Sequence, residues 1–480
     1  MSDTGVTVKK NIDFSEWYVE VVLKAELADY APVKGCMIIR PDAYAVWEKI
    51  QEVVNQKIKA TGHRNTYFPM FIPEAFLKRE AEHFEGFTPE VAWITQGGNT
   101  PLEEKLAVRP TSETIMYSMY AKWIRSWRDL PLKINQWCNI VRWETKATKL
   151  FLRTREFLWQ EGHTAHQTAE ECEAEVIWAL NMYKDVIENI LSIPVLIGTK
   201  SESEKFAGAI YTTALESIMP DGKALQMGTS HNLGQHFAKV FDVKYIGEDK
   251  ADHYVWQSSW GITTRLIGAM IMIHGDDKGL IMPPKVAPTQ IVIVPIPFKG
   301  QDADAIAAKT HEIAEILKTK GLSVILDDRQ EYTPGWKFNQ WELKGVPVRI
   351  ELGPRDLKNE QVVMVRRDTG QKTFVKETDI PATVEQLLQD IQDNLLTKAR
   401  TLLQEKITNV TSYDEFKQIV EGKGGFIKAS WCGSPECEAK IKEETGATIR
   451  IIPFEKETPT TGCIYCGAKG KDIAYFARSY

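Results

Sequence analysis

The sequence predicts three domains: an α+β domain with an antiparallel sheet and flanking helices over residues 1–283, an α/β domain over 284–404, and a small α/β domain over 405–480. Three observations support this prediction. Helical and extended runs alternate irregularly before the proline-rich segment 283–288, whereas strands and helices follow one another regularly after it. Four of the seven cysteines fall within 432–466. A chain of 480 residues is long enough for about three domains.

The first domain contains runs with a helical or an extended pattern. Ile115, Met119 and Trp123 recur every four residues and predict one helix. A β-rich run at Asn65–Ile72 ends between two prolines. The predicted helices of this domain are Ala43–Lys59, Thr111–Trp123, Glu170–Ile190 and the apolar Leu266–Ile273.

Two extended runs carry charged and aromatic side chains on one face. The run Lys133–Glu144 places Arg142 and Glu144 on the same face, because side chains alternate along a strand. After a loop the chain returns with a second set on a single face: Arg153, Arg155, Phe157, Trp159, Glu161 and His163. Guanidinium groups, an aromatic face and a carboxylate suit an anion that is attached to a flat ring. The alternative is a salt-bridged surface hairpin.

A third arginine stands in the segment Ser258–Arg265. It follows Gly261 and directly precedes Leu266–Ile273, which is predicted to form a helix beneath a pocket. An arginine in that place suits the opposite face of a nucleobase, or a phosphate. Taken alone, an arginine in this position is more often a helix cap or a surface residue. Arg265 is interpreted as a binding residue because the two extended runs also carry arginines.

The second domain has the regular alternation of an α/β fold. Its charge differs from that of the whole chain, since 337–372 holds eight Lys or Arg and five Asp or Glu, a net charge of +3, whereas the chain carries −6. A local basic region of this kind can attract a polyanion. The predicted elements are strands at Ile291–Pro295, Leu322–Leu326, Val346–Leu352 and Gln361–Arg366, and helices at Ala303–Lys320 (closed by Gly321) and Val384–Gln404.

The third domain carries two close cysteine pairs, Cys432-x4-Cys437 and Cys463-x2-Cys466. Four thiolates in two pairs predict a tetrahedral zinc site, which is structural because no ligand position is left for a reactant. Gly467 follows the last cysteine and is free to take a positive φ. The alternative is four unrelated reduced thiols.

Composition and charge limit the remaining classes of protein. A hydrophobic content of 43% and a charged content of 26% are those of an ordinary globular protein. No apolar run approaches the roughly 18 residues that span a bilayer, and Met1–Thr4 has no basic and apolar leader. We therefore expect a cytoplasmic protein without a membrane partner. The net charge of −6 argues against a general nucleic-acid coat.

Together these motifs resemble the prolyl-tRNA synthetases, a family of class II aminoacyl-tRNA synthetases. The segments similar to the class motifs are His63–Pro69 (motif 1, the dimer strand), Arg142-x-Glu144 with Arg153 and Phe157 (motif 2), and Gly261–Arg265 (motif 3). Those similar to the family are Arg109–Glu113, Trp159–His163 and Gly228–Gln235. The cysteines and the final Tyr480 resemble the archaeal and eukaryotic type. Motif 3 departs from the class pattern, since it lacks alternating glycines and Thr264 stands where an acid precedes the arginine.

The resemblance covers nearly the whole chain and implies a class II catalytic domain, an anticodon-binding domain and a zinc-binding domain. The implied activity is that of a proline–tRNA ligase, which activates L-proline with ATP to prolyl-adenylate and transfers it to the 3′ end of tRNA(Pro). Arg142 and Arg265 are the expected catalytic residues. The implied ATP-binding residues are Arg142, Glu144, Arg153, Thr154, Phe157, Gln226, Thr229, Thr263 and Arg265, with Mg²⁺ on the phosphates.

The resemblance also implies a proline site and an anticodon site. The implied proline-binding residues are Thr111, Glu113, Arg142, Trp159, Glu161, His163, Phe206 and His231. Without the resemblance, Thr111–Glu113 is more simply an ordinary helix cap. Arg349 suits the O6 and N7 edge of an anticodon guanine, Glu342 suits the N1 and N2 donors of another, and Lys372 suits a phosphate. The alternative for these three is a solvated strand edge.

Four further expectations follow. The chain forms a homodimer. The span between His163 and Gly261 is filled by predicted helices and strands, so no editing domain is inserted there and alanine or cysteine is activated without hydrolysis in cis. The resemblance implies that the carboxylate of Tyr480 docks near the catalytic site, whereas from the sequence alone a frayed tail is the simpler interpretation. A regulatory paralogue would have lost the motif arginines, and a threonyl or histidyl synthetase is the other competing hypothesis.

Overall fold

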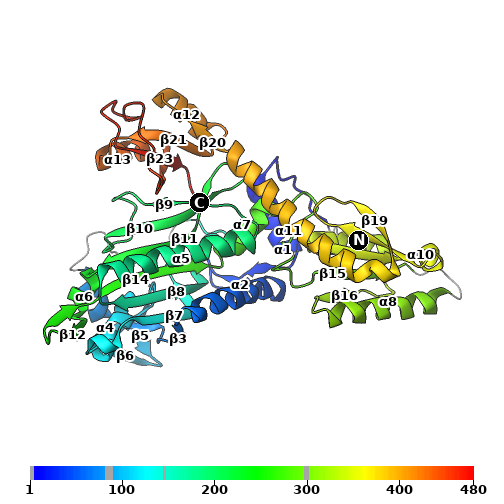
Figure 1. The fold of residues 1–480 in the computed structure, drawn as a ribbon, viewed down its shortest axis with the longest axis horizontal. Coiled ribbons are helices and arrows are strands. Elements are labelled where there is room, and N and C mark those ends of the chain that lie inside the picture. Colours follow the sequence, from blue (N-terminus) through cyan, green and yellow to red (C-terminus); the bar gives the residue numbers. More distant parts are fainter. Residues whose placement is uncertain (1–4, 82–89, 144–146, 297–301) are drawn as a thin grey trace.

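The computed structural model describes residues 5–81, 90–143, 147–296 and 302–480. Within these residues the largest element is an eleven-stranded sheet, which the long helix α5 (Ala169–Asn189) crosses on one face (Figure 1). In order across the sheet the strands are β20 (Ile407–Asn409), β21 (Phe426–Trp431), β23 (Asp472–Ala477), β22 (Thr448–Pro453), β9 (Leu196–Thr199), β10 (Tyr211–Ile218), β11 (Ala224–Gly234), β14 (Trp256–Thr263), β8 (Glu156–His166), β7 (Leu132–Val141) and β3 (Arg64–Asn65).

The strands from β22 to β7 pair antiparallel, which confirms the predicted fold of the catalytic region. The even-numbered residues of β8 face α5: the Tyr183 hydroxyl of α5 donates to Gln160 Oε1 at 2.5 Å. A Cβ at Gly162 would lie 2.2 Å from the ring of Trp260, so only glycine fits there. The odd-numbered residues of β8 therefore face away from α5.

Further helices and small sheets surround the large sheet. α7 (Arg265–His274) is almost wholly buried between it and the N-terminal helices. The other elements are α1 (Phe14–Lys24), β1 (Ala28–Tyr30), β2 (Met37–Ile39), α2 (Pro41–Ala60), β4 (Phe71–Pro73), α3 (Glu74–Ala81), β5 (Trp93–Gly97), β6 (Thr100–Val108), α4 (Glu113–Trp123), η1 (Trp127–Asp129), α6 (His236–Phe241), β12 (Lys244–Ile246) and β13 (Asp252–Tyr254).

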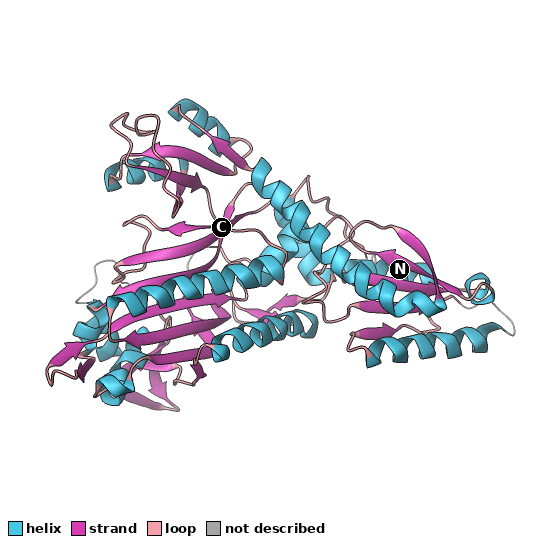
Figure 2. Cartoon of the chain, in the orientation of Figure 1, coloured by secondary structure: helices cyan, strands magenta, loops and turns pink. Residues whose placement is uncertain are grey.

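The α/β region, residues 291–405, has its own sheet in the order β16–β15–β17–β18–β19 and its own apolar core. Its last helix, α11 (Ile380–Glu405), packs against this sheet, α7 and β20, and so links the α/β region to the rest of the molecule (Figures 1 and 2). The elements are β15 (Ile291–Pro295), α8 (Asp302–Thr319), β16 (Val324–Leu326), α9 (Pro334–Leu343), β17 (Val348–Leu352), α10 (Pro354–Lys358), β18 (Gln361–Arg366), β19 (Lys372–Lys376) and η2 (Glu377–Asp379).

The C-terminal region, residues 407–480, adds α12 (Tyr413–Glu421) and α13 (Pro435–Thr445) to its four strands. Its strands do not form a separate sheet, because β22 pairs with β9 and continues the large sheet. A Cβ at Gly198 of β9 would lie 2.3 Å from the Ile452 carbonyl oxygen, so this close approach requires glycine.

The predicted single run Asn65–Ile72 is wrong. Its two ends are β3, at the edge of the large sheet, and β4, in a separate sheet with β6 and β5. Between them, the main chain of Phe68 is satisfied by side chains, since its N–H donates to Gln136 and its carbonyl accepts from Arg109. A strand neighbour is therefore not needed there. No helix of the described residues is long and apolar enough to cross a membrane.

Candidate active site

A cavity of about 330 Å³ opens on the face of the large sheet that lies away from α5. It is lined by β8, β11 and β14, the start of α4, the start of α7 and the loop after β9. The predicted ATP and proline residues that line it are Thr111, Glu113, Arg142, Arg153, Thr154, Phe157, Trp159, Glu161, His163, Phe206, Gln226, Thr229, His231, Thr263 and Arg265. The remaining one, Glu144, lies outside the described residues. The cavity thus brings together side chains that lie more than 150 positions apart in the sequence.

Three arginines from separate elements converge on this cavity. Arg142 follows β7, Arg153 precedes β8, and Arg265 is the first residue of α7. Burial, and then the charges of Arg142 and Arg153, lower the pKa of Arg265 to about 10, so it remains a cation at neutral pH. Arg142 donates to the Pro110 carbonyl at 3.1 Å, and Arg265 donates to the carbonyls of Leu152 at 3.2 Å and Gln226 at 3.3 Å. Arg153 donates to the terminal carboxylate of Tyr480 at 3.4 Å.

The face predicted for the second extended run is only partly correct. Phe157, Trp159, Glu161 and His163 all line the cavity, as alternation along β8 requires. Arg155 does not, because β8 begins at Glu156 and the alternation does not reach it. Its Nη1 donates to the Lys34 carbonyl at 3.0 Å, and its guanidinium lies 4.2 Å from the ring centroid of Trp143.

A β-bulge shapes the β11 wall of the cavity. The register between β10 and β11 shifts so that Gln226 opposes Glu216 and Gly228 opposes Leu215, which leaves Met227 without a strand partner. A bulge changes the direction in which nearby side chains point. As a result Gln226, which strict alternation with Thr229 would turn away, also lines the cavity.

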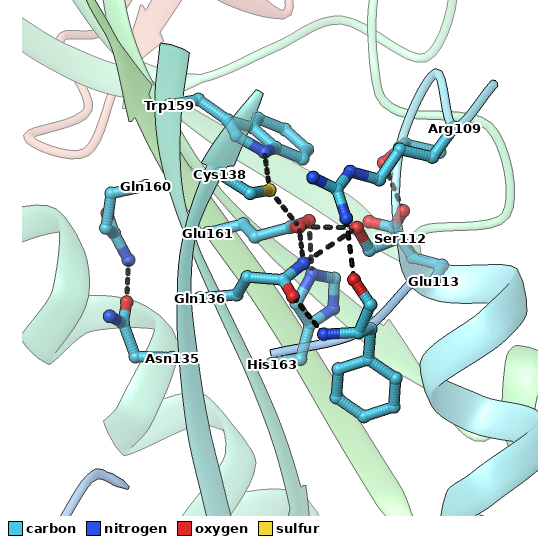
Figure 3. A network of polar contacts seen from close by, with 12 residues as sticks. Arg109, Ser112, Glu113, Asn135, Gln136, Cys138, Trp159, Gln160, Glu161 and His163 are labelled. Carbon is cyan, nitrogen blue, oxygen red and sulfur yellow. Dashed lines mark hydrogen bonds and ion pairs between the residues drawn. The ribbon is translucent and has the colours of Figure 1, made fainter. Parts of the chain in front are cut away.

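A buried polar network lies behind the cavity wall (Figure 3). One oxygen of Glu161 accepts from Ser112 Oγ at 2.5 Å and from Gln136 Nε2 at 2.9 Å, and the other pairs with His163 Nε2 at 2.9 Å. The hydroxyl of Ser112 makes no capping bond to α4. The interpretation of Thr111–Glu113 as an ordinary helix cap is therefore wrong, because this hydroxyl serves the network instead.

The pKa values of two histidines of the cavity are shifted in opposite directions. Burial lowers the pKa of His163, but its hydrogen bond to Glu161 and the charge of Glu113 outweigh that effect, and the net pKa is raised. Burial lowers the pKa of His231 to about 4. His231 is thus neutral at physiological pH, and its ring packs 4.8 Å from that of Phe206. Groups whose pKa values are pushed apart in one cavity are typical of functional sites.

The last residue of the chain is ordered beside the cavity, so the frayed tail is the wrong alternative. The Tyr480 hydroxyl donates to Asp221 Oδ2 at 2.6 Å, and its N–H donates to the Ala224 carbonyl at 3.2 Å. Its terminal carboxylate accepts from Arg153.

The predicted anticodon residues lie together in the α/β region. Arg349 of β17 is only 7% exposed and is flanked by two carboxylates, at 3.3 Å from Glu342 and 2.9 Å from Glu351. Lys372 Nζ lies 3.3 Å from Glu351. Glu342 belongs to the last turn of α9 and, with Arg349, lines a small hollow. Arg349 thus lies on the central strand of its sheet, within a set of ion pairs rather than at a solvated strand edge, and the sequence did not single out Glu351.

The four predicted cysteines form one cluster. Cys432, Cys437, Cys463 and Cys466 have sulfur atoms within 4.8 Å of one another. The Cys432 sulfur lies 3.6 Å from that of Cys437 and 3.8 Å from that of Cys466, close to the about 3.8 Å expected between thiolates around one Zn²⁺. Burial raises the pKa of Cys463, but main-chain N–H groups bring it down to about 7. Gly467 has the expected positive φ of 71°.

Comparisons with known proteins agree with this geometry. Family models match residues 94–274 (tRNA synthetase class II core domain of the G, H, P, S and T types), 290–387 (anticodon binding domain) and 413–480 (prolyl-tRNA synthetase, C-terminal). The chain is 57% identical to the proline–tRNA ligase of Natranaerobius thermophilus over 98% of its own length and 96% of the relative, and 53% identical to that of Cenarchaeum symbiosum over 99% of both. The chain belongs to the prolyl-tRNA synthetases.

A solved prolyl-tRNA synthetase supports the same conclusion. The structure of the Cryptosporidium parvum enzyme, in complex with halofuginone and AMPPNP, has a TM-score of 0.96 and 46% sequence identity, with all of both chains covered. As a member of this family, the chain is an enzyme, a class II aminoacyl-tRNA synthetase that uses ATP to join proline to tRNA. The competing hypotheses of a regulatory paralogue and of a threonyl or histidyl synthetase are thus excluded.

Several residues around the site of this prolyl-tRNA synthetase were missed from the sequence. Gln136 binds both the N–H of Phe68 at 2.5 Å and the carboxylate of Glu161. Lys200 lines the cavity and pairs with the buried Glu216 at 2.7 Å. Alternation along β7 and β10 could have marked Gln136 and Glu216 as polar residues on a buried face, but no local pattern names their partners.

Proposed function

We propose that the cavity binds ATP and L-proline together and that its three arginines carry the activation step. A carboxylate oxygen of proline attacks the α-phosphorus of ATP, and pyrophosphate leaves. Arg142 lies between the two anions and offsets their repulsion, while Arg153 and Thr154 bind the distal phosphates. Positioning and charge neutralisation account for the rate, since no side chain has to transfer a proton. The observation that carries this proposal is the convergence of three guanidinium groups from separate elements on one cavity.

The nucleoside is proposed to lie between Phe157 and Arg265. Arg142 already lies 5.7 Å from the ring centroid of Phe157, so a base stacked on that ring would place its phosphates near Arg142. Arg265 covers the other face of adenine. Glu144 accepts from the adenine amino group, and the ribose and phosphate contacts are Gln226, Thr229 and Thr263.

Proline is proposed to bind at the Glu161 end of the cavity. Its two N–H donors match Thr111 and Glu113, which are already hydrogen-bonded to each other. Trp159 and Phe206 form flat apolar walls for the ring, and Arg142 takes the carboxylate. Glu161, His163 and the neutral His231 complete the polar side of the pocket.

For tRNA(Pro) we propose that the α/β region binds the anticodon through Arg349, Glu342 and Lys372. Support comes from the match of residues 290–387 to the anticodon binding domain and from the grouping of the three side chains. On binding, the Arg349 guanidinium would leave one of its carboxylate partners and donate instead to O6 and N7 of guanine. We divide the chain into domains 1–283, 284–404 and 405–480.

We also propose that the protein binds two metal ions, Zn²⁺ and Mg²⁺. The all-thiol donor set fits a structural Zn²⁺, and Cys432, Cys437, Cys463 and Cys466 would hold it; zinc supplies a cross-link between the two cysteine pairs and no reaction step. Metal analysis should find about one zinc per chain, and less in Cys463→Ser. Mg²⁺ would enter with ATP and be held mainly by its phosphates. Among the described residues, the cysteine cluster is the one group of potential metal ligands.

We further infer a cytoplasmic homodimer without hydrolytic editing in cis. Large apolar side chains near the motif 1 segment are exposed and would be covered in a dimer: Tyr67, Phe71, Trp93 and Trp123. Residues between His163 and Gly261 belong to the large sheet and the elements packed on it, which supports weak, uncorrected activation of alanine or cysteine.

The test of the proposed function is amino-acid-dependent ATP–pyrophosphate exchange with each of the twenty amino acids, followed by charging of tRNA(Pro). Proline should support the fastest exchange, with slow exchange for alanine and cysteine. Exchange with proline that requires none of the three arginines would reject the assignment of the cavity.

A further inference from the structure

The loop of residues 200–206, between β9 and β10, forms one wall of the cavity and is held from the C-terminal region. Lys200, Glu204, Lys205 and Phe206 line the cavity, and Phe206 packs against His231. Besides its own bonds to Thr212 of β10, this loop has contacts from α13 and, through Glu216, from β22, more than 230 positions later in the chain.

The first contact joins Ser201 to Glu438 of α13. Ser201 Oγ donates to Glu438 Oε1 at 2.6 Å, and both residues are buried, at 2% and 3% exposure. A buried carboxylate requires a donor, so this contact is costly to break. At the exposed rim of the same loop, Lys442 Nζ lies 3.2 Å from Glu204. An exposed ion pair adds little, and the buried bond is therefore the stronger restraint.

The second contact is a buried ionic cluster under the first residue of the loop. Glu216 of β10 is fully buried and pairs with Lys200 at 2.7 Å and with Arg450 of β22 at 2.8 Å. Burial raises the pKa of Glu216, but Arg450 and Lys200 outweigh it and the net pKa is lowered, so the carboxylate stays ionised. Removal of Arg450 would leave the buried Glu216 carboxylate paired with Lys200 alone, although it is positioned to pair with both cations.

We propose that Glu438 and Arg450 are positioning residues through which the C-terminal region holds loop 200–206 against the proline side of the cavity. The inference rests on the proposed placement of proline beside Phe206. The C-terminal region thereby sets the affinity for proline, although none of its α13 or β22 side chains lines the cavity. On the ATP side the C-terminal region makes a different contact, from Tyr480 to Arg153.

The test compares steady-state exchange kinetics of Ser201→Ala, Glu438→Ala and Glu438→Gln in the full chain. The first two should raise KM for proline about tenfold, as expected for a lost bond to a charged acceptor, with KM for ATP changed less than about twofold. Glu438→Gln keeps an oxygen acceptor and should retain most of the affinity. The double variant Ser201→Ala/Glu438→Ala should be no worse than Glu438→Ala alone, because that substitution already removes the contact to Ser201.

Glu443→Ala is the matched control. Glu443 lies on the same helix, is exposed and pairs only at the surface with Lys440, so its loss should leave both KM values unchanged. Amide hydrogen exchange should quicken in residues 201–206 of Ser201→Ala and stay unchanged in β11. Arg450→Lys should raise KM for proline less than Arg450→Met, because lysine keeps the charge beside Glu216.

The variant Phe206→Ala separates two kinds of failure. If Phe206→Ala raises KM for proline but Ser201→Ala and Glu438→Ala do not, the positioning role is wrong and the proline site stands. If Phe206→Ala has no effect either, the placement of proline is wrong. Equal losses for ATP and proline together with a lower unfolding temperature would also overturn the proposal, because they indicate a general loss of structure.

Discussion

The arginines of the cavity and the arginine of the α/β region are held in different ways. Arg142 and Arg265 donate to main-chain carbonyl oxygens, and Arg153 reaches the terminal carboxylate of Tyr480 at 3.4 Å. Arg349, by contrast, is clamped between the carboxylates of Glu342 and Glu351. A carbonyl oxygen orients a guanidinium without cancelling its charge, whereas a carboxylate does both.

The two regions are therefore suited to bind different partners. The cavity brings three guanidinium groups together, and such an arrangement attracts a triphosphate more strongly as water is excluded. The α/β region presents Arg349 in an aligned but compensated state, at 4.1 Å from the ring centroid of Phe338. A guanidinium that is already paired gains little binding free energy from a phosphate. It binds better to a partner that matches its two parallel N–H donors, such as the edge of a guanine.

The largest effect is expected for Arg142→Ala. Loss of a donor that meets developing charge should lower kcat/KM for proline-dependent exchange by about 10³-fold. Arg142→Lys retains the charge without the fork and should recover part of the activity. If the kcat/KM of Arg142→Ala for ATP–pyrophosphate exchange stays within a few-fold of wild type, the contrast between the two regions is wrong, because the charge of Arg142 would then be dispensable.

Arg349→Ala should give the opposite profile. Charging of tRNA(Pro) should fall about 10- to 100-fold, as expected for loss of a bidentate base contact, while exchange without tRNA is unchanged. Both reactions are measured on one preparation, so that a folding defect would appear in both. Equal loss in the two would contradict the separation of the regions.

Acid should destabilise the cavity region before the α/β region. Burial lowers the pKa of His166, His231 and His274 to about 4, whereas His311 in the α/β region is exposed. The unfolded chain binds protons near pH 6.5 and the folded chain does not, so stability is lost as pH falls from about 6.5 towards 4. Hydrogen exchange at pH 7 and pH 5 should show α7 losing protection while β15 and β17 keep theirs.

His274 allows this to be measured at one site. His274 Nε2 lies 2.8 Å from the Leu191 carbonyl, and His274→Gln keeps a donor there. Between pH 6.5 and 4.5 the free energy of unfolding should fall by about 2 kcal/mol less in the variant than in the wild type. Identical pH dependence in chemical denaturation would show that His274 does not titrate as described.

The smallest effect is expected for Gln136→Leu. The substitution removes one donor to Glu161 and the acceptor for the Phe68 N–H, so KM for proline should rise about tenfold. KM for ATP serves as the internal control. An equal rise for both substrates would mean that Gln136 supports the whole cavity rather than its proline side.

Local periodicity and spacing were sufficient to predict part of this molecule. Alternation by two placed Phe157 through His163 on one face, and the spacing of the cysteines predicted their cluster. The same alternation failed for Arg155, because the start of β8 depends on pairing with other strands rather than on the sequence of the run. Glu144 cannot be compared, since it lies outside the described residues.

Contacts between distant segments could not be predicted. Gln136 and Phe68 are 68 positions apart and Ser201 and Glu438 are 237 apart. No pattern within either segment identifies the other, because any buried polar group can pair with any suitable donor that the fold brings near. The pairing of β22 with β9 was missed for the same reason: strand propensity does not specify the neighbour.

A crystal structure with a non-hydrolysable prolyl-adenylate analogue tests the central claim most directly. It should place the phosphate within hydrogen-bond reach of Arg142, adenine between Phe157 and Arg265, and the prolyl ring beside Trp159 and Phe206. An analogue bound elsewhere, or bound in the cavity with the three arginines turned to solvent, would contradict the account.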